Sequence, residues 1–265
     1  MPTDDAIDLQ CAEYGPTSGP AVVLLHGFPL NRSMWDDQID ALASRFRVLI
    51  PDLRGHGASD APPGPYTMRQ HVRDVVRLLD RSGIERAALV GLSMGGYVAM
   101  NLMATHADRI WALALLDTRA EGDTEPSRAM RARQATEIKA EGLEPFIQTA
   151  IGRMFARDSI EREPELVARY RRMVEPARPA SVIAALQGLA LRSDVSSVLR
   201  GVRCPTLVIV GAEDSVTPPD DARRIAELVP GARLEVIPDV AHLSNMEAPA
   251  RVNELLVGLL TDATP

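Results

Sequence analysis

Short runs of Val, Ile, Leu and Ala recur along this chain of 265 residues, and they show no alternation of polar and apolar positions. Runs of this kind are typical of strands that are buried on both faces of a sheet. The runs that fit the pattern are residues 21–25, 48–50, 87–90, 111–116 and 206–210. They predict a parallel sheet with a layer of structure on each face.

Longer amphipathic segments separate these runs, at residues 34–46, 67–82, 219–228 and 248–260. The second of them opens with Thr67 and Gln70 at the spacing of a capping box and is followed by Gly83, a common helix terminator. Alternation of strand and helix indicates parallel strands joined by helical crossovers, and hence a doubly wound α/β sheet. The leading segment, residues 7–14, predicts an antiparallel edge hairpin.

One stretch, residues 119–179, interrupts the alternation. It has no strand pattern, and its helical patterns combine charges of both signs with apolar residues that would form one buried face. Ligands of open α/β sheets bind at the carboxyl ends of the strands, so a helical insertion after a strand is placed to cover them. We therefore expect a core domain of residues 1–118 and 180–265, with a helical cap, or lid, at residues 119–179.

Charge and composition exclude several classes of protein. The net charge is −7 and no basic block is present, which is a poor electrostatic match to nucleic acid. The longest apolar run, residues 110–116, is far shorter than the ~18–20 residues that span a bilayer, so no membrane partner is expected. Asp4, Asp5 and Asp8 stand where a secretory signal would need positive charge. With only two cysteines and no disulfide framework, the chain is expected to be cytoplasmic.

A Gly-x-Ser-x-Gly motif centred on Ser93 directly follows the expected strand 87–90 and precedes a helical run. A serine hydroxyl is a weak nucleophile unless it is held exposed beside a base. A sharp turn from strand to helix does this, and Gly91 and Gly95 supply the small residues that the turn needs. Ser93 is therefore the candidate nucleophile. The N–H of Met94, at the start of the helix, is a candidate donor to a developing oxyanion.

A second motif, His26-Gly27-Phe28, follows the expected strand 21–25. In a sheet of this kind the loop after that strand supplies the other oxyanion donor, and the Phe28 N–H is the candidate.

Five motifs occur in the order found in the α/β-hydrolase fold superfamily: His26-Gly27-Phe28, the segment 51–59 (Pro-Asp-Leu-Arg-Gly-His-Gly-Ala-Ser), the turn at Ser93, the segment 211–214 (Gly-Ala-Glu-Asp) and Ala241-His242. The chain resembles this superfamily over nearly its whole length. Within it, the chain is similar to bacterial carboxylesterases and to hydrolases like 3-oxoadipate enol-lactonase. The resemblance implies a mostly parallel sheet of the α/β-hydrolase type, serine hydrolase chemistry and no cofactor.

Two further residues complete a candidate triad. Asp214 follows the expected strand 206–210, which places it at the same edge of the sheet as Ser93, and His242 follows a further expected strand, 233–237. The chain order Ser, Asp, His is that of the α/β-hydrolases. His242 would act as general base and then general acid, and Asp214 would orient its imidazole.

Other assignments of the acid remain open at this point. Glu213 is adjacent to Asp214, and Asp117 ends the preceding strand, a position that supplies the acid in some relatives. Alternatively, Asp214 only caps a turn before Pro218.

The remaining histidines are not expected to act as the base. His26 and His56 are expected to order loops by hydrogen bonding, and His71 and His106, on helical stretches, are expected to be surface or cap residues. Scattered histidines without i, i+4 pairing or nearby cysteines also predict that no metal is bound.

Serine at the turn predicts acyl-enzyme chemistry, whereas haloalkane dehalogenases and epoxide hydrolases of this fold use aspartate there. The expected reaction is hydrolysis of a small carboxylic ester or lactone. Carbon–carbon bond hydrolases of ring-cleavage products and cofactor-free perhydrolases share the same triad and remain alternatives. A non-catalytic ligand receptor is an alternative of another class.

The substrate would be selected by the lid. An apolar acyl pocket is expected beside Phe28 and Met94, and its candidate lining residues are Trp35, Met130, Met154 and Phe155. The similarity to enol-lactonases implies a substrate with free carboxylates, for which the candidate partners are Arg128, Arg131 and Arg133. The insertion contains no tryptophan, unlike the lid of those lactonases, which favours a general esterase or lactonase.

Overall fold

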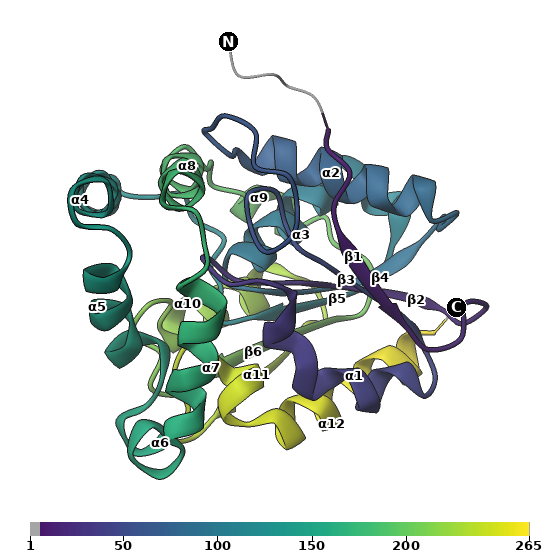
Figure 1. Ribbon diagram of the computed structural model, residues 1–265. Helices are drawn as coiled ribbons and strands as arrows, with labels where there is room; N and C mark the ends of the chain where they lie inside the picture. Colours follow the sequence, from purple (N-terminus) through teal and green to yellow (C-terminus); the bar gives the residue numbers. More distant parts are fainter. Residues whose placement is uncertain (1–5, 265) are drawn as a thin grey trace.

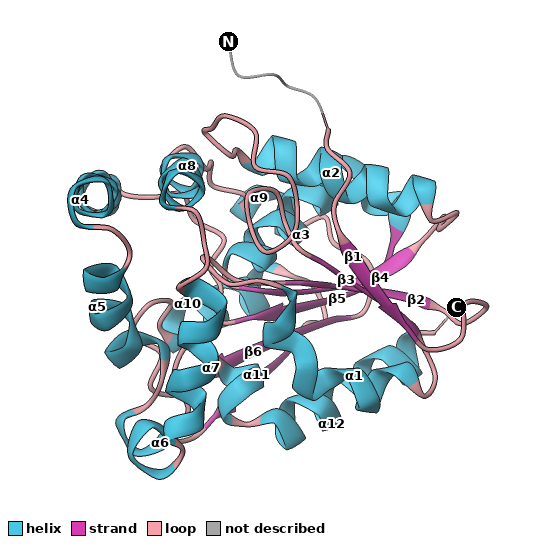
Figure 2. Cartoon of the chain, viewed as in Figure 1, coloured by secondary structure: helices cyan, strands magenta, loops and turns pink. Residues whose placement is uncertain are grey.

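The computed structural model describes residues 6–264, so Asp4 and Asp5 lie outside the described residues. Within this range the strands form one seven-stranded sheet with helices on both faces (Figures 1 and 2). Its spatial order is β1-β3-β2-β4-β5-β6-β7. The strands are β1 (Cys11–Tyr14), β2 (Ala21–Leu25), β3 (Arg47–Pro51), β4 (Ala87–Leu92), β5 (Ile110–Leu116), β6 (Thr206–Gly211) and β7 (Arg233–Ile237).

The sheet is parallel except for β1, which pairs antiparallel with β3 at one edge. The predicted strand runs all lie within strands, and every residue of β2, β4, β5 and β6 is buried, as runs without alternation require. The expected edge hairpin is replaced by the single strand β1. Its next neighbour in sequence, β2, instead pairs parallel with β3 and β4 in the interior of the sheet.

Two apolar cores cover the two faces of the sheet. Helices α1 (Asp36–Ala43), preceded by the 3-10 turn η1 (Arg32–Trp35), and α12 (Pro249–Ala263) pack together on one face. The other face carries α2 (Met68–Arg81), α3 (Met94–His106) with the short η2 (Ala107–Arg109), and α10 (Pro219–Leu228). The predicted capping box is present, because Thr67 and Gln70 exchange side-chain and backbone hydrogen bonds at the start of α2.

A helical insertion separates β5 from β6 (Figure 1, teal and green). Its elements are α4 (Glu125–Glu141), α5 (Glu144–Met154), α6 (Arg157–Arg162), α7 (Pro164–Val174), α8 (Pro179–Ala190) and α9 (Ser196–Leu199). The expected lid boundary at residue 179 coincides with the first residue of α8. However, α8 packs along α4, whereas α9 packs on α3 and α10. The helical layer above the sheet therefore includes α8.

No helix within residues 6–264 is both long and apolar enough to cross a lipid bilayer.

Three fully buried histidines lie beneath the loops that follow β2 and β3. His26 accepts a hydrogen bond from Leu53 N–H at 2.9 Å, and His56 lies beside it with its ring centroid 5.1 Å away. His71 was expected at the surface or as a cap, which was wrong, because it lies on the buried face of α2. Neither of its ring nitrogens has a hydrogen-bond partner among the described residues. Burial lowers the pKa of His26 to about 4 and that of His56 to about 3, and it also lowers the pKa of His71. All three rings are therefore neutral in the folded protein at neutral pH.

These rings make stability depend on pH. In the unfolded chain each histidine binds a proton below about pH 6.5, and the folded chain does not. The free energy of unfolding should therefore fall as the pH is lowered through this range. His71→Leu removes one such group and should make the slope between about pH 6 and about pH 5 shallower by about 1 kcal/mol per pH unit. Urea unfolding of both proteins at several pH values measures the difference. An unchanged slope would contradict the assignment.

Candidate active site

Ser93 occupies the sharp turn between β4 and α3. Its φ is 52°, in the left-handed region, and its N–H donates to the Leu116 carbonyl at 2.9 Å. A Cβ at Gly95 would lie 2.0 Å from the Leu25 carbonyl oxygen, and one at Gly91 would lie 2.4 Å from the Gly95 carbonyl oxygen. The backbone approaches itself so closely here that only glycine fits. This is the turn that the Gly-x-Ser-x-Gly motif predicts.

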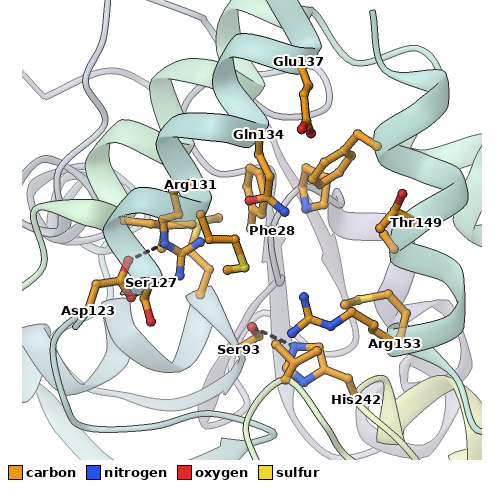
Figure 3. Close-up of a pocket in the computed structure, with 18 of the residues that line it drawn as sticks. Phe28, Ser93, Asp123, Ser127, Arg131, Gln134, Glu137, Thr149, Arg153 and His242 are labelled. Carbon is orange, nitrogen blue, oxygen red and sulfur yellow. Dashed lines mark hydrogen bonds and ion pairs between the residues drawn. The ribbon is translucent and has the colours of Figure 1, made fainter. Parts of the chain in front are cut away.

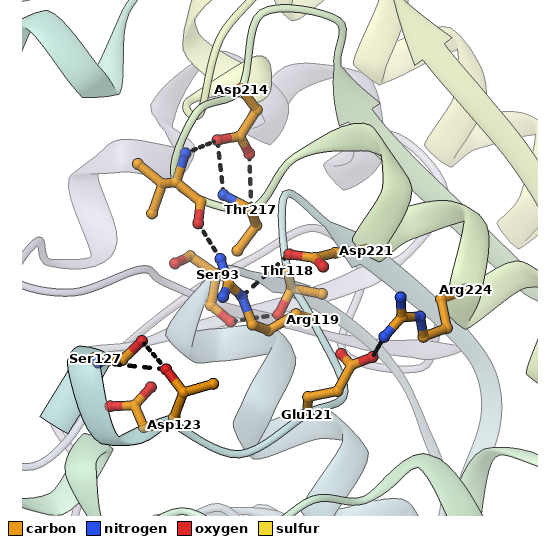
Figure 4. Close-up of polar contacts among 12 residues, drawn as sticks. Ser93, Thr118, Arg119, Glu121, Asp123, Ser127, Asp214, Thr217, Asp221 and Arg224 are labelled. Atoms are coloured by element: carbon orange, nitrogen blue, oxygen red, sulfur yellow. Dashed lines mark hydrogen bonds and ion pairs between the residues drawn. The ribbon is translucent and has the colours of Figure 1, made fainter.

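Ser93, His242 and Asp214 form one chain of hydrogen bonds. The His242 Nε2 atom lies 3.0 Å from Ser93 Oγ (Figure 3). The other ring nitrogen of His242, Nδ1, lies 2.8 Å from Asp214 Oδ2. An ionised carboxylate only accepts hydrogen bonds, so Nδ1 carries the proton and Nε2 accepts from the serine hydroxyl. Asp214 also accepts from the N–H groups of Val216 and Thr217 and from the Thr217 hydroxyl, at 2.7, 3.0 and 2.7 Å (Figure 4).

These contacts favour the charged form of Asp214. Burial alone would raise its pKa, but attraction to His242 and the hydrogen bonds from His242 and Thr217 outweigh burial and lower the pKa below its usual value. The opposite holds for Asp117, where burial and the neighbouring charge of Asp214 raise the pKa well above its usual range. A carboxyl group that resists ionisation is a poor partner for an imidazolium. The hydrogen bonds of Asp117 run instead to Gly211 and Ser244, and Glu213 is exposed.

The two residues expected to supply the oxyanion donors, Phe28 and Met94, lie near Ser93. Met94 is the first residue of α3, so its N–H has no acceptor within the helix and lies at the positive end of the helix dipole. Phe28 lies in the loop after β2, and both residues line the same cavity as Ser93. The neighbouring His26 is held by Leu53 and by the Gly27 carbonyl, which is the structural role expected of it.

A cavity of about 550 Å³ lies between the edge of the sheet that carries Ser93 and His242 and the helical insertion. Ser93 and His242 form part of its floor, and α4 and α5 supply much of its wall (Figure 3). The described residues contain no group of three or more His, Cys, Asp or Glu side chains placed to bind a metal. The hydrogen bonds from Asp214 through His242 to Ser93 are an arrangement that can present an activated serine hydroxyl to a small molecule in this cavity.

Comparison with known proteins shows the family to which the chain belongs. The family model of the alpha/beta hydrolase fold matches residues 20–249. The chain belongs to this family. It is 32% identical over 259 residues to 3-oxoadipate enol-lactonase 2 of Acinetobacter baylyi, a match that covers 97% of this chain and 95% of that protein.

Two solved structures of the family are similar throughout. A thermophilic esterase from Thermogutta terrifontis, solved with malate bound, superposes with a TM-score of 0.94 at 37% identity, covering 98% of this chain and 95% of that one. The enol-lactonase from Burkholderia xenovorans superposes with a TM-score of 0.90 at 34% identity, covering 96% of each chain. This α/β hydrolase is thus related to esterases and lactonases.

Two of the four expected lid and pocket residues lie away from the cavity. Met130 and Met154 line it, but Trp35 and Phe155 do not. Trp35 is fully buried at the end of η1, in the core of one sheet face. Phe155 turns inward after α5 and packs edge-on against Tyr170, with ring centroids 6.0 Å apart. The prediction that Trp35 and Phe155 line the pocket was therefore wrong. A large apolar side chain gives the same sequence pattern in a core as in a pocket, so the sequence could not distinguish the two.

The cationic residues expected to meet a carboxylate are also placed differently. Arg128 is half exposed and pairs with Glu125 at 3.3 Å. Arg131 lines the cavity, but it is held in an ion pair with the buried Asp123, a carboxylate that it shares with Arg192. Arg133 is exposed and does not line the cavity.

Sequence analysis missed Arg153, in the last turn of α5. Its guanidinium extends into the cavity towards Ser93 and His242 (Figure 3). Among the described residues it has no hydrogen-bond or ion-pair partner, unlike Arg131. The available signal was helical spacing, because Phe146, Thr149 and Arg153 recur on one face of α5 and all line the cavity.

The tight turn gives a test of the geometry at Ser93. Gly95→Ala places a methyl group against the Leu25 carbonyl, so we expect the free energy of unfolding to fall by about 1–3 kcal/mol, the range of overpacked cores. Gly258→Ala is the matched control, because a Cβ at that position in α12 meets nothing within 4 Å. It should raise the free energy of unfolding by about 0.5–1 kcal/mol. Chemical denaturation measures both, and equal effects would contradict the close approach.

Proposed function

We propose that this α/β hydrolase cleaves small carboxylic esters or lactones through an acyl-enzyme on Ser93. The observation that supports this most directly is the continuous hydrogen-bond chain from Asp214 through His242 to the Ser93 hydroxyl, at the floor of an enclosed cavity. The relationship to esterases and enol-lactonases supports the same class of reaction.

The first half-reaction forms the acyl-enzyme. His242 Nε2 removes the proton from Ser93 Oγ as the oxygen attacks the carbonyl carbon, and the Asp214 carboxylate stabilises the imidazolium. The carbonyl oxygen becomes an oxyanion that receives hydrogen bonds from the N–H groups of Phe28 and Met94. When the tetrahedral intermediate collapses, His242 returns the proton to the leaving alcohol oxygen, and the acyl group remains on Ser93.

The second half-reaction releases the acid. His242 removes a proton from water, the resulting hydroxide attacks the acyl carbon, and the same amides bind the second oxyanion. Collapse of this intermediate breaks the bond to Ser93 Oγ, which takes back the proton from His242. In a lactone the alcohol oxygen stays attached to the acyl chain, so one ring-opened hydroxy acid leaves. Every proton is carried by the chain's own groups, and the mechanism uses no cofactor.

The substrate we propose carries a carboxylate. Arg153 is a cation without a partner among the described residues beside Ser93 and His242, whereas Arg131 and Arg119, which also line the cavity, are paired with Asp123 and Asp221. The acidic Glu137 lies at the end of the cavity away from Ser93 (Figure 3). An anionic group close to the scissile carbonyl would therefore meet Arg153. The Thermogutta esterase binds malate, a dicarboxylate, which supports this class of ligand.

The triad is tested with short p-nitrophenyl esters and a fluorophosphonate probe. Ser93→Ala and His242→Ala should abolish turnover, with losses of about 10⁶-fold in kcat, and Asp214→Asn should lower kcat by about 10⁴-fold. Only proteins with Ser93 should be labelled by the probe, and substrate should protect against labelling. Folded wild-type protein that neither reacts with the probe nor cleaves any ester would favour a ligand receptor.

The same assay shows whether Asp214 or Asp117 is the acid of the triad. Near-normal turnover in Asp214→Asn, together with a complete loss in Asp117→Asn, would place the acid on β5 instead.

The anion preference is tested by comparing monomethyl succinate with dimethyl succinate, following acid release at constant pH. Arg153→Met should lower kcat/KM for the anionic monoester by about 10- to 100-fold, the range of a hydrogen bond to a charged group. The neutral diester should change by less than about threefold. Arg157→Met is the control, because this exposed arginine of α6 pairs with Glu161 and does not line the cavity. A uniform effect on both esters would exclude a carboxylate site at Arg153.

A further inference from the structure

The three residues at the exit of β5, Leu116 to Thr118, lie between the segments that carry the triad. In the sheet β5 separates β4, which leads to Ser93, from β6, which leads to Asp214. The next strand, β7, leads to His242. Residues at this exit can therefore contact all three segments at once.

Residues at the exit of β5 form hydrogen bonds with both backbone groups of Ser93, its N–H and its carbonyl. The Leu116 carbonyl accepts the Ser93 N–H at 2.9 Å, and the Thr118 hydroxyl donates to the Ser93 carbonyl at 2.8 Å (Figure 4). Because Ser93 has a positive φ, these bonds hold it in a conformation that a non-glycine residue adopts at a cost.

The side-chain carboxyl group of Asp117 connects the other two segments. Its Oδ1 accepts the N–H of Gly211, the last residue of β6, at 3.0 Å. Its Oδ2 accepts from Ser244, two residues after His242, with the hydroxyl at 2.5 Å and the N–H at 3.3 Å. One side chain thus bridges the loop that leads to Asp214 and the helix that follows His242.

Asp117 is itself held in an unusual state. It is completely buried and has a φ of 45°, and its own N–H donates to the Ile209 carbonyl at 2.9 Å. A buried carboxyl in a left-handed conformation is unfavourable by itself, so its surroundings must over-determine it. Residues in such strained conformations are common at functional sites. Asp117 stands between Leu116 and Thr118, the two residues that bond the Ser93 backbone.

We infer that Asp117 is a positioning residue for the triad, which sets the distance between Asp214 and His242 by tying Gly211 to Ser244. This inference rests on the proposed function. It also explains why an acidic residue stands at the exit of β5 although Asp214 is the partner of His242. Displacement of a catalytic group by about 1 Å can lower a rate about 100-fold, so a tie of this kind affects turnover more than substrate binding.

The test uses substitutions on both sides of the bridge. Asp117→Ala removes all three hydrogen bonds and should lower kcat for a short p-nitrophenyl ester by about 10- to 100-fold, with KM changed by less than about threefold. Asp117→Asn keeps an acceptor for Gly211 and tolerates a positive φ, so kcat should stay within about fivefold of wild type. Ser244→Ala removes the partner of Asp117 at the other end of the bridge and should also lower kcat. In the double variant Asp117→Ala with Ser244→Ala, the loss of kcat should be no larger than in Asp117→Ala alone.

A spectroscopic readout separates positioning from stability. The proton on His242 Nδ1 should give a downfield NMR signal from its bond to Asp214, which Asp117→Asn should preserve and Asp117→Ala should shift or broaden. Asp74→Asn is the control. The buried Asp74 carboxylate pairs with Arg54, with 2.6 Å between Oδ2 and Nε, and this pair is not part of the triad. It should lower stability and leave both kcat and the NMR signal unchanged.

The outcomes are distinct. If Asp117→Ala is folded and its kcat and NMR signal match those of wild type, the inference is wrong. If Asp117→Ala does not fold, the inference is tested with Ser244→Ala and with the double variant that combines Ser244→Ala and Asp117→Asn. Unchanged kcat and NMR signals in both of these variants would overturn the inference. A complete loss in Asp117→Asn would make Asp117 the acid itself. Failure of the proposed function would instead appear in the wild type, as absence of both ester cleavage and probe labelling.

Discussion

The parallel order of β4, β5, β6 and β7 is the constraint on which the site depends. Parallel strands end at the same edge of a sheet, so the loops that follow them meet there whatever their separation in sequence. Ser93 and His242 are 149 positions apart, and Asp214 and His242 are 28 positions apart, yet their side chains are within hydrogen-bonding distance. Helical crossovers on the two faces of the sheet connect these parallel strands.

Electrostatics at this edge depend on how two nearby carboxyl groups are solvated by the protein. Asp214 receives hydrogen bonds from His242, Val216 and Thr217, which replace the water that burial removes and keep it charged. Asp117 is more deeply buried, and the charge of its neighbour raises its pKa further. The site therefore presents one strong anionic partner to the imidazole rather than two that repel each other.

The lid contributes charge as well as shape. Most of its charged residues form ion pairs with each other or with the core, as in Arg171 with Glu144 and Arg169 with Asp37. Such pairs at the surface add little stability, but each joins a cation to an anion and so leaves neither charge unpaired. Among the described residues, Arg153 lines the cavity near Ser93 without an ion-pair partner, and the proposed preference for an anionic substrate therefore depends on it.

The sequence by itself determined the strands, the turn at Ser93 and the order of the triad. These features depend on local physics: unbroken apolar runs, glycines two positions on either side of a serine, and polar residues directly after strands. The tertiary structure decided the rest, because the deciding contacts join distant segments. Whether Trp35 faces a core or a pocket, whether Arg131 is free or is paired with Asp123, and whether Asp117 meets His242 or Ser244 all depend on which surfaces pack together. Burial and pairing are properties of neighbours in space, and neighbours in sequence do not specify them.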